Sequence, residues 1–278
     1  LNFPKLNNAK LLDDYRLSII IPKIFGKTAF VSPLPLSNNG EVLVFTKEQG
    51  AHLGVVAAFG DFQTYKFDLS YTLERSGTIA LPADTAYQRV FYDQIQPPPK
   101  NVEIDTDGNW LAIYTLDPQS KPLNITASGQ AHVLSEATQT MPVPSRKDLT
   151  TYIKPTRYWP STDPVFIQLS KQYRTPRQIY DYVVRTLGYD FTQIGQSNQR
   201  KGALAALNNP LQSLCSEFTD LFIPMSRAAN IPAREINGFA YTTDSRLRPL
   251  FLAGIDALHS WPQYWDEKRQ VWISVDPT

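Results

Sequence analysis

Hydrophobic and polar residues alternate along the first half of the chain in short segments. A period of two is typical of strands that bury one face. The alternating segments are residues 15–21, 41–46, 53–59, 65–73, 88–94, 110–116 and 125–133. Gly and Pro separate them, and Asp107-Gly108 favours a tight hairpin because both residues tolerate positive φ. About seven strands at this spacing predict a β-sandwich of the immunoglobulin-like type over residues 1–140.

The hydrophobic period changes after a proline-rich segment. Four prolines, at positions 142, 144, 155 and 160, predict a linker over residues 141–160. Beyond the linker, apolar residues first recur at helical spacing and then form extended segments. Helices followed by strands are typical of an α+β domain, which we expect over residues 161–278.

Local signals mark the first two expected helices. Asp163-Pro164 begins one, and Thr175 begins the next with a capping box to Gln178 and Pro176 at the first helical position. Gly188 is expected to end the second helix.

A third helix is expected from the apolar spacing after Ser213, which is a good N-cap residue. It should end at Asn230, which tolerates the left-handed conformation, and Pro224 should bend it or cost a hydrogen bond. Extended segments at 233–241, 259–265 and 270–275 follow.

The composition is that of a globular protein. The chain has 278 residues, 42% of them hydrophobic, and a formal net charge of +1. Because the charges are interspersed, we expect no nucleic-acid partner. The chain contains no run of about 18 apolar residues, so we expect no membrane segment within it. The chain begins at Leu1 and stops two residues after Asp276, which leaves open a signal, an anchor or a further domain in the parent protein.

Cys215 is the only cysteine, so no internal disulfide can form. Its position at the start of a predicted helix favours the thiolate, because the helix dipole is positive there. His259 begins one expected strand and Asp276 follows the next. If those strands pair antiparallel, Asp276 would hold one ring nitrogen of His259 and the other would face Cys215.

Each of these residues alone has a simpler explanation. A lone Cys on an apolar helix is usually a small buried hydrophobe, His259 alone would be structural, and Asp276 before Pro277 would start a turn. Taken together and in this order, the three favour catalysis. No metal site or cofactor is expected: the Asp105–Asn109 segment fits a hairpin turn better than a calcium loop, and no glycine-rich phosphate loop occurs.

The residues around this trio resemble the transglutaminase-like superfamily, thiol enzymes with a papain-like fold. The resemblance covers roughly residues 160–278, and its motifs lie at 181–190, 215–218, 227–234, 237–240, 259–264 and 272–278. It implies that Cys215 is the nucleophile, His259 the base and Asp276 the residue that orients the base. Asn230 stands where the family more often has Gly, and Gln263 where it often has an acidic residue. The N-terminal half is more weakly similar to the β-sandwich that precedes this core in many bacterial members.

The resemblance implies covalent chemistry on proteins or peptides. Cys215 would attack a carboxamide, and the thioester would pass to an amine, giving a crosslink, or to water, giving hydrolysis. Expected partners are therefore Gln and Lys side chains or a peptide bond. The alternatives are a cysteine peptidase of the same fold and a non-catalytic surface binding or scaffold protein. We expect an extracellular or cell-surface location, with a tether outside this chain as one possibility.

Overall fold

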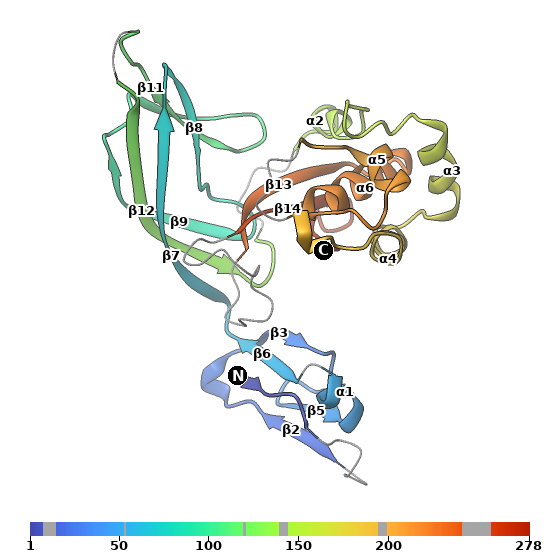
Figure 1. Ribbon diagram of the computed structural model, residues 1–278. Coiled ribbons are helices and arrows are strands. Elements are labelled where there is room, and N and C mark those ends of the chain that lie inside the picture. The colour runs from blue at the N-terminus through green and yellow to red at the C-terminus, as the bar shows by residue number, and fades with distance from the viewer. Residues whose placement is uncertain (8–14, 53, 119–120, 139–143, 194–198, 241–256) are drawn as a thin grey trace. The chain divides into compact units, whose positions relative to one another are not determined.

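The computed structural model describes residues 1–278 except 8–14, 53, 119–120, 139–143, 194–198 and 241–256 (Figure 1). The chain divides into two compact units, Leu1–Met141 and Pro142–Thr278. The expected boundary between residues 140 and 141 lies outside the described residues, so the limits 1–140, 141–160 and 161–278 stay a prediction. Over the described ranges, none of the helices has the length and apolar character needed to span a bilayer.

The N-terminal unit begins with short strands around a small apolar cluster. Its elements are β1 (Asn2–Phe3), β2 (Arg16–Ile20), β3 (Thr28–Ser32), β4 (Ser37–Asn38), β5 (Val42–Thr46), helix α1 (Lys47–His52) and β6 (Val55–Phe59). The strands pair antiparallel in the orders β1-β6-β3 and β2-β5-β4. Both sheets contribute to one cluster, with Leu43 and Phe45 from β5 and Val55 from β6 fully buried.

A second cluster of the same unit lies between two further antiparallel sheets. These sheets contain β7 (Phe62–Leu73), β8 (Gly77–Leu81), β9 (Gln88–Gln96), β10 (Asn101–Ile104), β11 (Trp110–Tyr114) and β12 (Leu123–Leu134). Their orders are β7-β12-β9 and β10-β11-β8. Ala112, Ile125 and Ala127 are among the most buried residues of this cluster. The hairpin expected at Asp107-Gly108 joins β10 to β11, and Gly108 has a φ of 89°.

The predicted strand-rich N-terminal region is confirmed. Each of the seven alternating segments overlaps a strand, although residue 53 of the segment 53–59 lies outside the described residues. The strands bury two separate apolar clusters, whereas the sequence predicted a single sandwich. Alternation shows which face of a strand is buried but not which other strand covers it, so the sequence pattern could not distinguish one cluster from two.

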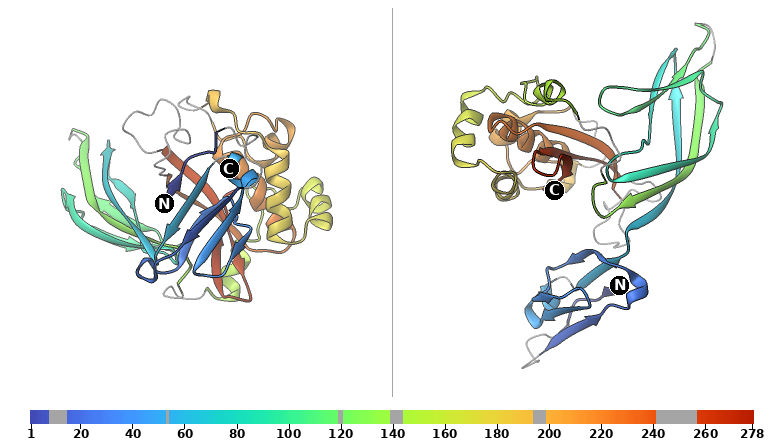
Figure 2. Two further views of the ribbon diagram at one scale, coloured as in Figure 1. Left: turned by 90° about the horizontal axis from the view of Figure 1, so that it is seen from below. Right: turned by 180° about the vertical axis from the view of Figure 1, so that it is seen from behind.

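The C-terminal unit has helices first and strands last, which confirms the α+β prediction. Its elements are α2 (Arg146–Thr151), α3 (Pro164–Gln172), α4 (Pro176–Thr186), α5 (Ala203–Asn208), α6 (Cys215–Ala228), β13 (Ala233–Ala240), β14 (Ala257–Asp266) and β15 (Val271–Ser274). The three strands form one antiparallel sheet with β14 in the centre. Helix α6 packs against β14, and Figure 2 shows the helices gathered beside this sheet.

Helix α6 forms the centre of this unit. Leu221, Phe222 and Met225 are fully buried and pack with Phe166 of α3 and Val183 of α4. Every residue of α6 from Glu217 to Arg227 is buried, including Pro224 within the helix. A helix that is buried on all sides is held by its neighbours, so its first residue, Cys215, has a well-defined position.

The predicted helix signals are largely confirmed. Asp163 caps α3 by accepting from the N–H of Val165 at 3.0 Å, and Thr175 and Gln178 form the capping box of α4. Asn230, directly after the C-cap of α6, has a φ of 61° and so adopts the left-handed conformation expected of it.

The start expected for the third helix was wrong. Helix α6 begins at Cys215, and its N-cap position is Leu214 instead of Ser213. The hydroxyl of Ser213 donates to the carbonyl of Pro210 at 3.1 Å, so it does not cap the helix. The buried carboxylate of Glu217 instead accepts from the N–H of Leu214 at 2.9 Å. Tertiary contacts of Ser213 therefore override its local propensity.

Residues of the segment 141–160 contact the rest of this unit. Leu149 of α2 packs with Trp265 and Trp272 of the sheet. Farther along, the indole of Trp159 donates to Asp220 of α6 at 2.7 Å. These contacts join the segment to both the sheet and the central helix.

Candidate active site

Cys215 is half-buried at the N-terminus of α6. The chain before it is held by a parallel bridge between Tyr189 and Ser213, in which Asp190 donates its N–H to the carbonyl of Ser213 at 2.8 Å. The N–H groups of Cys215 and Ser216 belong to the first helical turn, where the helix itself supplies no acceptor. The residue therefore lies at the positive end of the helix dipole, beside donors that an anion could use.

His259 and Asp276 lie side by side on neighbouring segments of the sheet. His259 is near the start of β14, and Asp276 follows β15, which pairs antiparallel with β14. The Nε2 atom of His259 lies 2.8 Å from Oδ2 of Asp276. The other carboxylate oxygen of Asp276 accepts from the N–H of Thr278 at 3.1 Å. This arrangement leaves Nδ1 of His259 for another partner.

Cys215 acts on His259 besides Asp276, and hydrogen bonding to His259 and Ser260 contributes to the pKa of its thiol. Burial raises the pKa of the Cys215 thiol, but these hydrogen bonds and the positive charge of His259 outweigh burial, so the net pKa is lowered. Hydrogen bonds to Asp276 and then to Cys215 raise the pKa of His259 to about 9, against an opposing effect of burial. Both shifts favour a thiolate beside an imidazolium.

Two further ionisable groups face this pair. Burial raises the pKa of Asp276, but its contacts with His259 and Thr278 outweigh burial, so the carboxylate form is favoured. The pKa of Tyr189 is raised to about 12, first by burial and then by the negative charges of Cys215, Glu217 and Asp276. The phenol of Tyr189 therefore stays protonated beside the site.

Residues 163–277 match the family model of the transglutaminase-like superfamily. This match includes Cys215, His259 and Asp276. The C-terminal domain belongs to the transglutaminase-like superfamily.

Two solved structures of other proteins are similar to this chain. A putative cysteine protease from Cytophaga hutchinsonii is 18% identical, with a TM-score of 0.55 over 79% of this chain and 78% of that chain. The periplasmic domain of TgpA from Pseudomonas aeruginosa is 16% identical, with a TM-score of 0.40 over 78% of this chain and 72% of that chain. No curated protein matches the sequence. The family match supports a thiol enzyme.

The structure thus brings together the three residues that the sequence singled out in the transglutaminase-like domain. Sequence reasoning missed two supporting residues, Thr219 and Tyr189. Thr219 lies four residues after Cys215, on the same face of α6, and its hydroxyl donates to the carbonyl of Ser260 at 3.1 Å. The helical spacing from Cys215 could have indicated Thr219, whereas nothing in the spacing connects Tyr189 with Cys215.

The structure shows how the amide of Gln263 is accommodated. Gln263 is buried in β14. Its Oε1 accepts from Nε of Arg234 on β13 at 3.0 Å, and its Nε2 donates to the hydroxyl of Ser274 on β15 at 2.9 Å. The neutral amide therefore connects all three strands, because it can accept on one side and donate on the other.

A partly buried ion-pair network contacts α6. Arg200 donates to both carboxylate oxygens of Asp220 and, through Nη1, to Glu235 of β13 at 2.9 Å. Asp220 is fully buried and also accepts from Trp159. Removing Arg200 would leave the buried charge of Asp220 without an ion partner, so Arg200 connects α6 to β13.

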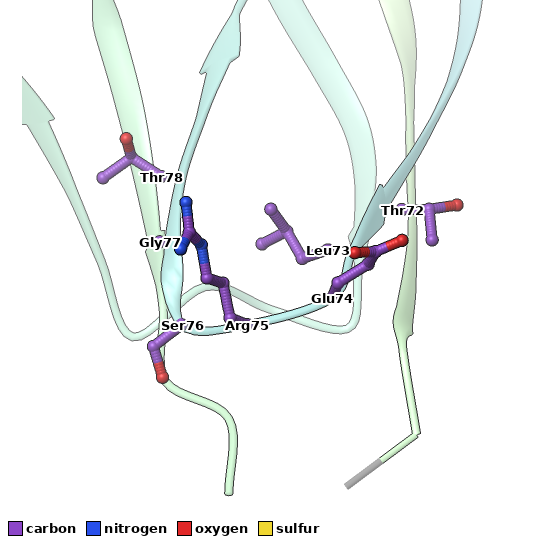
Figure 3. Close-up of a pocket in the computed structure, with 7 residues that line it drawn as sticks. All are labelled: Thr72, Leu73, Glu74, Arg75, Ser76, Gly77 and Thr78. Carbon is purple, nitrogen blue, oxygen red and sulfur yellow. The ribbon is translucent and has the colours of Figure 1, made fainter. Parts of the chain in front are cut away.

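The hollow in Figure 3 is a different feature of the chain. It is lined by seven consecutive residues, 72–78, at the turn between β7 and β8, and includes none of the three candidate catalytic residues. In the part of the chain that the structure describes, no group of three or more His, Cys, Asp or Glu is arranged to hold a metal ion.

Proposed function

We propose that the transglutaminase-like domain is a thiol enzyme that transfers the acyl group of a protein carboxamide through a thioester on Cys215. One observation carries the proposal: His259 lies 2.8 Å from Asp276 and lowers the pKa of Cys215, which begins a buried helix. A nucleophile, a base and a group that orients the base are the parts that covalent acyl transfer requires.

In the first step the thiolate of Cys215 attacks the carbonyl carbon of the carboxamide, and a C–S bond forms. The carbonyl oxygen becomes an oxyanion, which the N–H groups of Cys215 and Ser216 stabilise. The imidazolium of His259 then donates its proton to the nitrogen, and the C–N bond breaks. Ammonia leaves from a Gln side chain, or an amine leaves from a peptide bond, and the thioester remains.

In the second step a primary amine or water attacks the thioester. His259, now neutral, accepts the proton of the attacking group, and the C–S bond breaks to regenerate the thiolate. An amine gives a new amide and therefore a crosslink, whereas water gives a carboxylic acid. Because both acceptors use the same residues, the accessibility of water to the thioester decides between the two products.

Peptide hydrolysis is the second candidate function. The Cytophaga hutchinsonii structure is described as a protease, and the same steps applied to a peptide bond give cleavage. We favour the carboxamide proposal because residues 163–277 match a transglutaminase-like model. The chemistry of the site is the same in both.

The test combines three measurements on the complete chain. With a glutamine-rich protein and a fluorescent primary amine, we expect amine incorporation and release of ammonia, and without the amine, ammonia alone. Peptide libraries test cleavage in parallel. Cys215→Ala should abolish every product while the fold, checked by circular dichroism, is kept.

The rival class is a binding or scaffold protein. If the wild type forms no product from any substrate and a mechanism-based electrophile forms no adduct at Cys215, the enzyme proposal is overturned. A binding activity unchanged in Cys215→Ala would then support the scaffold hypothesis.

We also propose an extracellular or cell-surface location, because a strand-rich region precedes the transglutaminase-like core. Fractionation of the source cells, with detection of the protein by an antibody, tests this proposal.

A further inference from the structure

Thr219 lies at the contact between helix α6 and strand β14, which pack against each other (Figure 1). It is fully buried and lies four residues after Cys215, so the two residues share one face of the helix. Its hydroxyl lies 3.1 Å from the carbonyl oxygen of Ser260, the residue that follows His259 on β14. One side chain thus connects the helix that begins with the nucleophile to the strand that carries the base.

The direction of this hydrogen bond follows from its two partners. A carbonyl oxygen can only accept, so the single hydroxyl proton of Thr219 goes to the backbone of Ser260. The hydroxyl oxygens of the two residues lie 3.4 Å apart, which is long for an O–H···O hydrogen bond, commonly about 2.5–3.0 Å. The bond to the carbonyl is therefore the stronger contact, and it holds the backbone of β14 instead of a side chain that can rotate.

Other polar contacts join α6 to a different strand of the sheet. Arg200 connects Asp220 of α6 to Glu235 of β13. Near the end of α6, Arg227 donates to a backbone carbonyl of β13. Both contacts reach β13, whereas Thr219 reaches β14 one residue from the base. Without the Thr219 hydroxyl, α6 would stay joined to β13 but would lose a contact that fixes its distance from β14.

We propose that Thr219 is a positioning residue, which holds His259 at its working distance from Cys215 through the hydrogen bond to the backbone of Ser260. The proposal deepens the proposed thiol chemistry and rests on it. Thr219 acts through the placement of the base, and a small misplacement of a catalytic group is enough to slow a reaction.

A change in this placement has a measurable effect on ionisation. A thiolate and an imidazolium attract each other, and the attraction weakens as they separate. At an effective dielectric constant of about 20, moving two unit charges from about 4 to about 5 Å apart shifts a pKa by about 0.6. The titration of the Cys215 thiol therefore reports on the position of His259.

Other charged groups around Cys215 also affect its ionisation. His259 of β14 is the positive group, and Asp276 after β15 lies beyond it. Tyr189, which precedes α6 in the chain, and Glu217 of α6 itself also act on the site. The variants below leave all four groups unchanged, so differences between the variants report on the placement of these groups.

The experiment measures the rate of iodoacetamide alkylation of Cys215 against pH in the complete chain. Thr219→Val keeps a side chain of similar shape without the hydroxyl. The midpoint of its thiolate titration should move upward by about half a pH unit, that is, about threefold less thiolate at a given pH below the midpoint. Thr219→Ser keeps the hydroxyl and should restore the wild-type midpoint. With substrate, Thr219→Val should lower kcat about tenfold and change KM by less than about twofold.

Two variants of α6 serve as controls. Ile223 is fully buried eight residues after Cys215, and Ile223→Val lowers stability by loss of a methylene without removing a hydrogen bond. Its melting temperature should fall, while the midpoint stays at the wild-type value. Ser226→Ala removes a second buried hydroxyl of the same helix, one with no hydrogen-bond partner within the described part of the chain. It should leave both the midpoint and kcat unchanged.

Two results would overturn the proposal: an unchanged midpoint in Thr219→Val, or an equal upward shift in Ile223→Val. If Thr219→Val does not fold, Thr219→Ala and Thr219→Ser replace it, because both lack the methyl group and only the second keeps the hydroxyl. Equal midpoints in that pair would also contradict the positioning role.

Alkylation needs no substrate, so the two proposals can fail separately. A midpoint that rises in Thr219→Val while the wild type forms no product would count against acyl transfer alone. Product from the wild type with an unchanged midpoint in Thr219→Val would count against the role of Thr219 alone.

Discussion

His259 sets the ionisation of the site at the scale of single residues. Its pKa of about 9 results first from the hydrogen bond to Asp276 and then from the one to Cys215. The imidazolium is therefore maintained through neutral pH and lost as the pH rises through about 9. Because this folded-state pKa is raised above 6.5, the ionisation also stabilises the fold below pH 6.5, and that contribution disappears through pH 9.

From this we predict a bell-shaped dependence of kcat/KM on pH. Activity should fall above about pH 9, where the imidazolium is lost, and also at low pH, where the thiolate is protonated. The acid limb should lie below the ordinary thiol pKa, since the pKa of Cys215 is lowered. A rate that keeps rising past pH 10 would contradict the assignment of His259 as the proton donor.

Two substitutions of Asp276 separate the effect of its negative charge from its effect on the orientation of the His259 ring. Asp276→Asn removes the charge but keeps an acceptor for the ring, so the alkaline limb should move from about 9 toward 6.5. Asp276→Ala also removes the orienting contact and should lower kcat/KM by about 100-fold at its best pH. Steady-state kinetics on both variants checks this, and identical profiles for the two would show that orientation contributes nothing.

At the scale of elements, the end of α6 gives a prediction about stability. Asn230 adopts a φ of 61°, which disfavours residues with a Cβ by about 1–2 kcal/mol, Asn less than most. Asn230→Ala should therefore lower the free energy of unfolding by about 1 kcal/mol. Asn230→Gly is the matched control and should be neutral or slightly stabilising. Urea denaturation measures the free energy of unfolding of both variants. Equal losses in the two would exclude the positive φ of residue 230 as the cause.

The pairing of β13 with β14 gives a prediction about activity. Gly238 lies opposite His259, and a Cβ at Gly238 would come within 2.9 Å of Cη2 of Trp261, whose ring stacks on that of His259. Gly238→Ala should displace the indole and with it the imidazole, so kcat/KM should fall about tenfold or more. Gly77→Ala in β8, where a Cβ has ordinary room, is the control. Equal activity of Gly238→Ala and wild type would show that Trp261 does not position His259.

At the scale of the whole molecule, all three candidate catalytic residues and their supports belong to the unit Pro142–Thr278. We predict that a fragment of residues 144–278 folds and keeps the alkylation profile of Cys215. A fragment of residues 161–278 lacks Leu149, which packs against the sheet, and Trp159, which donates to buried Asp220. The free energy of unfolding of this shorter fragment should be lower by several kcal/mol. That loss is comparable to the whole stability of a domain, about 5–15 kcal/mol. Thermal unfolding of the two fragments checks this, and equal melting temperatures would support the linker predicted over residues 141–160.

Much of the local structure could be predicted from short sequence signals. Thr175 with Gln178, Asn230 and Asp107-Gly108 act through contacts with residues only a few positions away, so their effect is visible in the sequence. Ser213 shows the limit of such signals, because its hydroxyl bonds to Pro210 and the cap is supplied by Glu217.

The sequence by itself determined the types of residue at the site, the strand and helix pattern, and the order of the α+β core. Only the tertiary structure decided that His259 lies beside Asp276 and acts on Cys215, and that the N-terminal strands bury two clusters. The physical reason is the separation along the chain between the residues that interact. Periodicity and capping are local properties of the backbone, whereas a distance of 2.8 Å between His259 and Asp276 depends on how separate elements pack.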